Sequence, residues 1–237
     1  DWLWVKECML NLGIQQVMRR NPKYIAWIDA DIEFQNKDWV CETMQQLQVN
    51  LYVQMFQNAI DLGPTGETLQ VHTGFMYSYW TDKRFSGKYG QYAHPGFAHA
   101  MRAEVFKHMR LLDTPILGAA DHHMCMALVG RGKESYPQTV TQGYKEDILS
   151  WQSLADRHIV GNVGYVPGSI THYWHGKKRN RFYQERWKII TENHFDPNVD
   201  LAISGNGLYT LVGNKRKLRD DIRKYFLSRN EDSTDVD

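Results

Sequence analysis

Apolar and polar positions along the chain follow two periods in turn, one typical of strands and one typical of helices. Residues 24–28, "YIAWI", form a short run of aromatic and β-branched residues directly after the turn signal "NP", which predicts a buried strand. Over residues 1–20, apolar residues recur at roughly helical spacing and basic residues follow at the end. This segment predicts a helix that leads into the strand.

The remaining chain continues to alternate. A helix capped by Asp38 is predicted over residues 37–48, an extended segment over 51–60 and a turn over 61–67. Residues 63–95, rich in glycine, tyrosine and polar residues, predict a long irregular connection of the kind that often carries function. Further predicted elements are a strand entering a helix over 95–113, a helix over 118–132 that starts near Asp121, a turn and strand over 163–176, and a helix over 180–195.

This order of elements indicates one α/β domain. With 237 residues, 42% of them hydrophobic, the chain can bury a sizeable core. We expect a single domain over residues 1–226 and a disordered acidic tail over 227–237, which ends in "EDSTDVD". Because the sequence opens in mid-fold on a helix-to-strand step, we also expect an earlier strand to be missing or truncated.

Charge and cysteine content narrow the function classes. A formal net charge of +1, from 28 basic and 27 acidic residues, gives no global footprint for nucleic acid or a membrane surface. Three widely spaced cysteines, Cys8, Cys41 and Cys125, argue against a disulfide framework and favour a reducing compartment. No apolar run approaches the roughly 18 residues of a membrane span, and no signal-peptide pattern opens the chain. We therefore expect a cytoplasmic protein with no membrane segment.

Two aspartates follow the predicted strand at residues 24–28. Asp29 and Asp31 are separated by one residue, so on an extended chain both carboxylates point to the same side and can face one ligand. That arrangement suits a divalent cation. A lone Asp-x-Asp occurs by chance in many proteins, but its position at the end of an apolar strand favours a metal site.

Four segments carry a resemblance to a known family. They are "WIDADIEF" at 27–34, "GFAHAMRAEVF" at 96–106, "GAADHHM" at 118–124 and "HYWHGKKRNRFYQERW" at 172–187. Their order resembles that in metal-dependent glycosyltransferases with the GT-A fold, close to the family-2-like enzymes of phages and bacteria and more distantly similar to the β-1,4-galactosyltransferase group. The match covers about residues 1–200. It implies a Rossmann-like α/β fold, with a mixed sheet flanked by helices and its N-terminal nucleotide-binding strand missing or truncated here.

The resemblance also implies a metal site. Asp31 would bind the ion directly, while Asp29 would contact the ribose of the donor or a metal-bound water. His172 and His175 match the spacing of two further ligands in the galactosyltransferase group. Mixed oxygen and imidazole ligation favours Mn²⁺ over Mg²⁺. Positions three apart on a straight strand face opposite ways, so this interpretation requires a bend near Gly176, and the alternative is that the histidines only pack beside the neighbouring aromatic residues.

In the same way, the resemblance implies a catalytic base. Inverting transfer needs a group that takes the proton of the attacking hydroxyl, and "GAADHHM" offers Asp121, with His122 as a weaker alternative that also lies at the substrate site. Ala120 replaces the adjacent acidic residue of the galactosyltransferases, a difference that bears on acceptor binding. An acidic residue early in a helix is also favourable as a simple cap, so that interpretation of Asp121 stays open.

Basic residues follow the histidines. Lys177, Lys178 and Arg181 are candidates to neutralise the diphosphate of the donor, with a solvated basic turn as the alternative for each. Gly96 is a candidate for a close approach of the backbone to the sugar, with an ordinary turn after Pro95 as its alternative.

The expected function is transfer of a hexose from a nucleotide diphosphate sugar, UDP-linked, with inversion and with help from Mn²⁺ or Mg²⁺. The acceptor hydroxyl belongs to a modified DNA base, a glycan or a protein, and for a viral chain the location is the host cytosol. One alternative is a metal-dependent hydrolase that uses Asp29, Asp31, His122, His123, His172 and His175. Another is a non-catalytic sugar-binding fragment.

Overall fold

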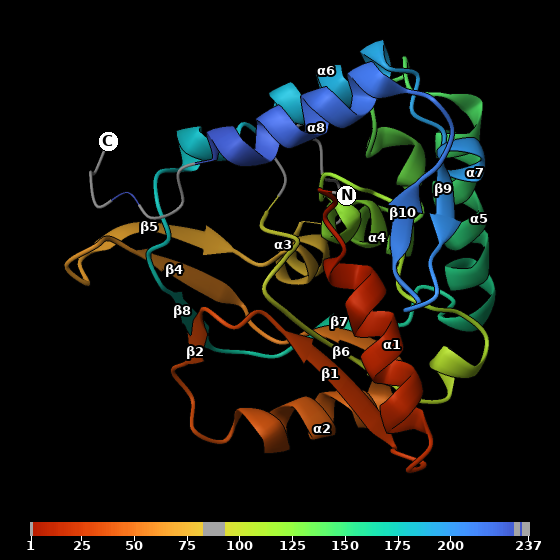
Figure 1. The fold of residues 1–237 in the computed structure, drawn as a ribbon. Coiled ribbons are helices and arrows are strands. Elements are labelled where there is room, and N and C mark those ends of the chain that lie inside the picture. The colour runs from red at the N-terminus through yellow and green to blue at the C-terminus, as the bar shows by residue number, and fades with distance from the viewer. Residues whose placement is uncertain (1, 83–92, 230–232, 234–237) are drawn as a thin grey trace.

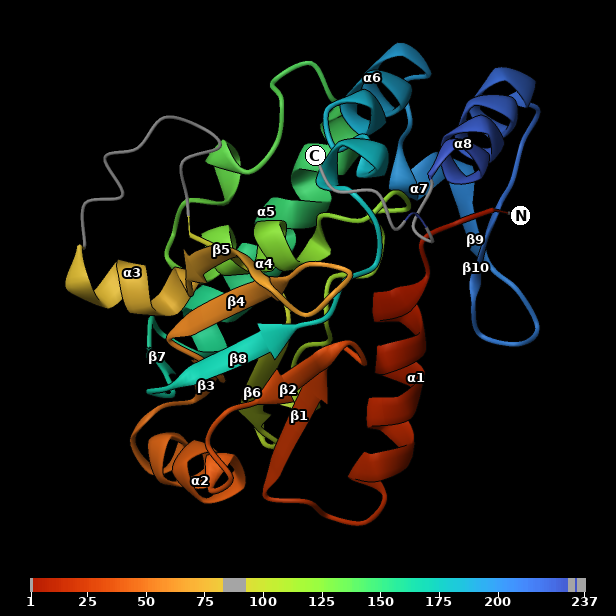
Figure 2. The ribbon, with the colours of Figure 1, turned by 90° about the vertical axis from the view of Figure 1, so that its left-hand side faces the viewer.

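A computed structural model describes residues 2–82, 93–229 and 233. Two four-stranded sheets and a separate β-hairpin carry its strands, and helices surround the sheets, as the two views in Figures 1 and 2 show. The described chain therefore has a mixed α/β architecture, as the alternating sequence pattern predicts.

The elements have the following bounds. The helices are α1 (Lys6–Met18), α2 (Trp39–Val49), α3 (Phe75–Thr81), α4 (Ala120–Leu128), α5 (Gln142–His158), α6 (Glu185–Glu192), α7 (Pro197–Asp200) and α8 (Arg216–Ser228), with 3-10 turns η1 (Val105–Lys107), η2 (Gly132–Glu134) and η3 (Lys178–Arg181). The strands are β1 (Tyr24–Ile28), β2 (Ile32–Phe34), β3 (Tyr52–Gln54), β4 (Asn58–Leu62), β5 (Thr68–Thr73), β6 (Ala98–Arg102), β7 (Val163–Tyr165), β8 (Ser169–His172), β9 (Leu201–Ile203) and β10 (Tyr209–Leu211).

The larger sheet has the strand order β1-β6-β3-β7. Strand β6 runs antiparallel to both of its neighbours, and β3 pairs with β7 in parallel. The predicted strand at residues 24–28 is confirmed as β1, but it lies at the edge of the sheet and only alternate residues are buried. Ile25 and Trp27 face the core, whereas Ile28 is 37% exposed, because an edge strand covered on one face keeps the two-residue alternation.

Both faces of the larger sheet are covered. On β3 the neighbouring residues Tyr52 and Val53 belong to different hydrophobic clusters, and since successive strand residues point to opposite faces, these clusters lie on opposite sides of the sheet. One cluster contains Leu47 of α2. The other is much larger and takes residues from α1, α3, α4, α5 and α8.

The smaller sheet, with the order β2-β8-β4-β5, continues from the end of β1. The segment between β1 and β2 contains Asp29 and Asp31. In the register of this sheet His172 of β8 lies between Ile32 of β2 and Asp61 of β4. Consequently, one cross-strand row brings three distant parts of the chain to the same place.

The irregular connection predicted over residues 63–95 is wrong for the described part of that segment. It contains β5, which forms a hairpin with β4, and α3. The turn between β4 and β5 includes Gly66 at a φ of 87°, a conformation that glycine permits. Strand β5 is mostly exposed, so it lacks the apolar alternation that reveals a half-buried strand. Residues 83–92 lie outside the described residues.

The helix predicted within residues 95–113 is also wrong, because only the short turn η1 follows β6. Buried residues continue after η1 at Met109, Leu111 and Leu112. The backbone N–H of Leu111 donates to Asn11 Oδ1 at 2.9 Å, and its carbonyl accepts from Asn11 Nδ2 at 2.9 Å. Since a side chain of α1 takes these hydrogen bonds, the segment packs into the core without forming a helix.

Other predicted helices are present with shifted ends, at α1, α2, α4 and α6. Asp38 occupies the N-cap position of α2, but its side chain makes no capping hydrogen bond. Sequence reasoning missed α5, the hairpin β9–β10 and α8. Helix α8 runs to Ser228, two residues into the predicted tail, since Leu218, Ile222 and Tyr225 bury one of its faces. Among the described residues, no helix is both long and apolar enough to cross a membrane.

Asn11→Ala tests the contact between α1 and the segment after η1. The substitution leaves the buried backbone groups of Leu111 and the carboxylate of Asp113 without the Asn11 amide. We expect the free energy of unfolding to fall by about 2 kcal/mol, measured by urea denaturation. Gln15→Ala on the exposed side of the same helix is the matched control, and an equal effect of both substitutions would contradict the assigned role of Asn11.

Candidate functional site

Asp29 and Asp31 lie between the last residue of β1 and the first residue of β2. Their side chains reach different partners. Asp29 Oδ1 accepts a hydrogen bond from Lys6 Nζ at 3.0 Å, whereas Asp31 Oδ2 lies 3.5 Å from His172 Nε2 and 3.3 Å from His175 Nε2. Of the two aspartates, only Asp31 joins the histidines.

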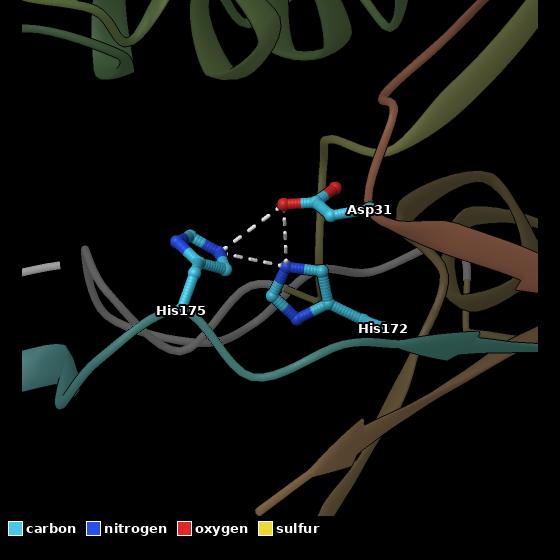
Figure 3. A group of neighbouring side chains, drawn as sticks. All are labelled: Asp31, His172 and His175. Carbon is cyan, nitrogen blue, oxygen red and sulfur yellow. Dashed lines mark hydrogen bonds and ion pairs between the residues drawn. The ribbon is translucent and has the colours of Figure 1, made fainter. Parts of the chain in front are cut away.

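The two histidines approach Asp31 from the end of β8, as Figure 3 shows. His172 is the last residue of β8, and the chain leaves the strand before His175. The bend therefore starts ahead of Gly176, which follows at a φ of 85°. The two rings lie nearly perpendicular with centroids 4.9 Å apart, and their Nε2 atoms are 3.0 Å apart.

Asp31, His172 and His175 form a three-residue cluster whose ligand atoms lie within 4.8 Å of one another. Its donor set is one carboxylate oxygen and two imidazole nitrogens, which suits a divalent transition metal. The hydrogen bond with His172 lowers the pKa of Asp31 against the opposing effect of burial. Burial disfavours a charged His172, but Asp31 and Asp61 outweigh it and raise the pKa of that imidazole.

Asp61 of β4 contacts the cluster through His172. The sequence analysis did not identify Asp61 as a site residue. His172 Nδ1 donates to Asp61 Oδ1 at 2.9 Å. His72 Nε2 lies 2.8 Å from Asp61 Oδ2, and Lys178 Nζ lies 2.5 Å from it. These partners outweigh burial and hold the pKa of Asp61 well below its usual range. An ionised Asp61 fixes the His172 proton on Nδ1 and leaves Nε2 available as a ligand.

The three basic residues after the histidines, Lys177, Lys178 and Arg181, have different surroundings. Lys178 bonds Asp61 and Gln70 Oε1, the latter at 3.1 Å. Arg181 Nη2 lies 2.9 Å from His175 Nε2, and its Nη1 donates to the hydroxyl of Tyr183 at 3.2 Å. Lys177 is buried and lines a smaller cavity of about 220 Å³ beside the cluster.

Lys6 at the start of α1 is the main cation near Asp29. Its Nζ lies 3.0 Å from Asp29 and 3.7 Å from Glu7 Oε1. Burial raises the pKa of Glu7 to about 7 against the effect of Lys6, and Asp121 adds to the rise. The two residues were absent from the sequence analysis because a charged pair in the first turn of a helix resembles an ordinary solvated end.

Asp121 is the second residue of α4, and Ala119 holds the N-cap position, so Asp121 is not the N-cap. Its Oδ1 accepts from the His122 amide at 2.8 Å. Burial opposes ionisation, but Lys6, that amide and the Arg186 guanidinium lower the pKa of Asp121. Burial also lowers the pKa of His122. Asp121 is therefore an ionised carboxylate beside a neutral imidazole.

Gly96 lies directly against Asp121. A Cβ at Gly96 would be 2.8 Å from Asp121 Oδ2 and 3.2 Å from Cε1 of His94. His94 in turn stacks on Phe97 at 3.9 Å between ring centroids, and burial lowers its pKa to about 3. The glycine thus provides room for the carboxylate.

One cleft of about 670 Å³ contains most of these groups. It is lined by every residue predicted for the transferase site except Lys177: Gly96, Asp29, Asp31, Asp121, His122, His172, His175, Lys178 and Arg181. Residues that the sequence analysis missed also line it: Lys6, Glu7, Asp61, His94 and Arg186. The cleft thus combines a candidate metal cluster, a separate ionised carboxylate and several cations.

The six residues of the alternative hydrolase site do not gather in one cluster. Asp29 pairs with Lys6. His123 is fully buried, and its ring nitrogens contact Ser135 Oγ at 2.7 Å and the Tyr144 hydroxyl at 3.0 Å. Those two hydrogen bonds make His123 a satisfied residue of the core.

Comparisons with known proteins give no assignment: no family model, no curated protein and no solved structure matches the chain. The chemistry of the site therefore has to be argued from its own residues.

Asp61→Asn tests the support of the cluster. Replacing the carboxylate weakens the hydrogen bond that orients His172, so we expect the affinity for Mn²⁺ to fall about 10- to 100-fold, measured by titration calorimetry or by the EPR signal of free Mn²⁺. Glu67→Gln removes an equal charge from the exposed part of the same hairpin and serves as the control. An unchanged affinity in Asp61→Asn would show that His172 does not depend on Asp61.

Glu7 predicts a dependence of stability on pH. Its pKa in the folded protein, about 7, lies above the ordinary value of 4.5, so the folded state binds more protons than the unfolded state between these values. Stability therefore falls as pH rises from 4.5 to 7, by an amount on the order of 3 kcal/mol. In Glu7→Gln this loss of stability should disappear. If the unfolding free energies of the variant and the unsubstituted protein change with pH in parallel, the raised pKa of Glu7 is contradicted.

Proposed function

We propose that the chain is a Mn²⁺-dependent glycosyltransferase of the GT-A type that transfers a hexose from a UDP-sugar to an acceptor hydroxyl with inversion. The observation that carries the proposal is the convergence of Asp31, His172 and His175 in the cleft that also contains Asp121. A metal cluster and a separate base are the two parts that such a transfer requires.

The donor atoms of the cluster fit Mn²⁺. A carboxylate oxygen with two imidazole nitrogens favours Mn²⁺ over Mg²⁺, which prefers oxygen ligands and retains water. Asp31, His172 and His175 would supply three ligands to the ion, and the diphosphate would supply others. When bound, the ion supplies an electrophile that stabilises the negative charge on the leaving diphosphate.

The protein's own cations would complete the donor site. Arg181 lies beside His175 and can donate several hydrogen bonds to phosphate oxygens. Lys178 is held by Asp61, so its charge lies next to the metal ligands. Asp29 would receive the ribose, and its contact with Lys6 would have to loosen or be shared with the donor.

Asp121 is the proposed base. The acceptor oxygen forms a bond to the anomeric carbon, the bond from that carbon to the diphosphate oxygen breaks, and the acceptor proton passes to Asp121. The lowered pKa of Asp121 keeps the carboxylate ionised at neutral pH and ready to accept this proton. The position of Gly96 lets the carboxylate take its place at the wall of the cleft.

A zinc hydrolase is the second candidate, because two histidines and a carboxylate also form catalytic zinc sites. The cluster supplies only three of the six residues that this alternative requires. Stoichiometric zinc retained through purification, together with hydrolysis lost on chelation, would favour the hydrolase over the transferase.

Calorimetric titration of UDP into the protein, with and without Mn²⁺, tests the donor site. We expect Mn²⁺-dependent binding that Asp31→Ala weakens at least about 100-fold, the loss of roughly 3 kcal/mol that follows removal of a charged ligand. Glu33→Ala removes an exposed carboxylate two residues away and should leave the affinity unchanged. An affinity for UDP that is the same with and without Mn²⁺ would overturn the proposal of a metal-dependent donor site.

Asp121→Asn separates binding from chemistry. We expect it to leave UDP affinity within about twofold while slowing UDP release from UDP-hexoses, with water as the acceptor, by about 100-fold or more. A loss of UDP binding in this variant would count against Asp121 as the base.

A further inference from the structure

Two arginines line the cleft, and both contact Tyr183. Arg181 contacts His175 at the metal cluster. Arg186 lies beside Gly118, where an added Cβ would be 3.5 Å from its Nη1. From there its charge helps to lower the pKa of Asp121. Arg186 therefore lies close to Asp121, the proposed base, where the acceptor has to bind.

Arg186 has no anionic partner within the described part of the chain. Its side chain makes no hydrogen bond or ion pair there, and its Nε is buried without a hydrogen-bond partner. Two aromatic rings hold the guanidinium instead, with centroids 5.2 Å away at Tyr183 and 5.7 Å away at Trp187. Such contacts orient an arginine but leave its N–H groups free to bind an anion.

An aromatic surface lies next to this arginine. Trp4 lines the cleft, and a Cβ on Gly118 would be 3.9 Å from its indole ring. Since Gly118 has no side chain, the ring and the Arg186 guanidinium approach the same piece of backbone. The Arg229 guanidinium lies 5.4 Å and Lys6 Nζ lies 6.0 Å from the centroid of the Trp4 ring. A sugar ring with a charged substituent would pack on this indole in place of one of these cations.

The charges nearby limit the ligand to few negative groups. Glu7, Asp29 and Asp121 line the cleft around Lys6. A polyanion such as DNA would place many phosphates close to these carboxylates, at a cost in repulsion. A ligand with a single oxyanion avoids that cost.

We propose that the acceptor is a saccharide bearing one carboxylate or phosphate, with its oxyanion bound by Arg186 and its ring against Trp4. This inference rests on the proposed transferase function and adds the substrate class. It places the charged substituent at Arg186 and the acceptor hydroxyl near Asp121.

NMR titration of the full chain with three small probes tests the inference. The probes are methyl β-D-glucuronide, glucose 6-phosphate and neutral methyl β-D-glucoside. We expect at least one anionic probe to bind about tenfold or more tightly than the neutral one, the effect of a charge-assisted hydrogen bond. The preferred anionic probe identifies the substituent as carboxylate or phosphate.

Matched variants assign the preference to Arg186. Arg186→Gln should remove the preference and leave binding of the neutral probe unchanged, and Arg186→Lys should retain part of it. Lys188→Gln removes the same charge from an exposed position of α6 and should retain all of it. Thermal unfolding checks that each variant is folded.

Three results would overturn the inference: equal binding of all probes, a preference that survives in Arg186→Gln, or a single-stranded oligonucleotide that binds more tightly than either anionic probe. Titration of UDP and Mn²⁺ into the same protein reports on the donor site separately. Lost preference with intact UDP binding overturns only the acceptor inference. A preference for anionic saccharides without UDP binding overturns the transferase function.

Discussion

The hydrogen bond between Asp61 and His172 is the interaction on which the site depends. It joins neighbouring residues of β4 and β8 in one row of the smaller sheet, and the next strand in that row delivers Asp31. A slip of the register by one residue would turn His172 to the opposite face. Strand pairing therefore fixes the position of His172, while Asp31 and His175 reach the cluster from the segments next to β2 and β8.

Charge balance in the cleft depends on a small number of cations. Lys6 contacts Asp29 and Glu7, and it also acts on Asp121. Without it, three carboxylates would share one partly buried space, where the cost of ionisation is high. Lys6 is thus placed to keep Asp121 charged, while Arg181 and Arg186 supply further positive charge to the cleft. Arg181 contacts the metal cluster at His175, whereas Arg186 acts on Asp121.

The sequence predicted elements of the fold and residues of the cleft where a local pattern of residues was sufficient to identify them. The apolar run at residues 24–28 predicted β1, and the motif resemblance selected residues that line one cleft. Strand β5 was missed because its surface is exposed and polar. Asp61 was missed because nothing local distinguishes an aspartate in a short strand from a surface residue. Its role appears only when β8, 111 residues later, lies beside it, and no local pattern contains that information.

The same sequence separations have a consequence for how the protein reaches its native state. The residues of the cluster lie in or next to strands that meet only after long loops close, and contacts of this kind form late and slowly. An unfolded chain holds Asp31 more than a hundred positions from the histidines, so it cannot offer the three ligands together. A bound ion would therefore favour the folded chain by mass action. Occupancy of the cluster would indicate that the long-range strand pairings around it have formed.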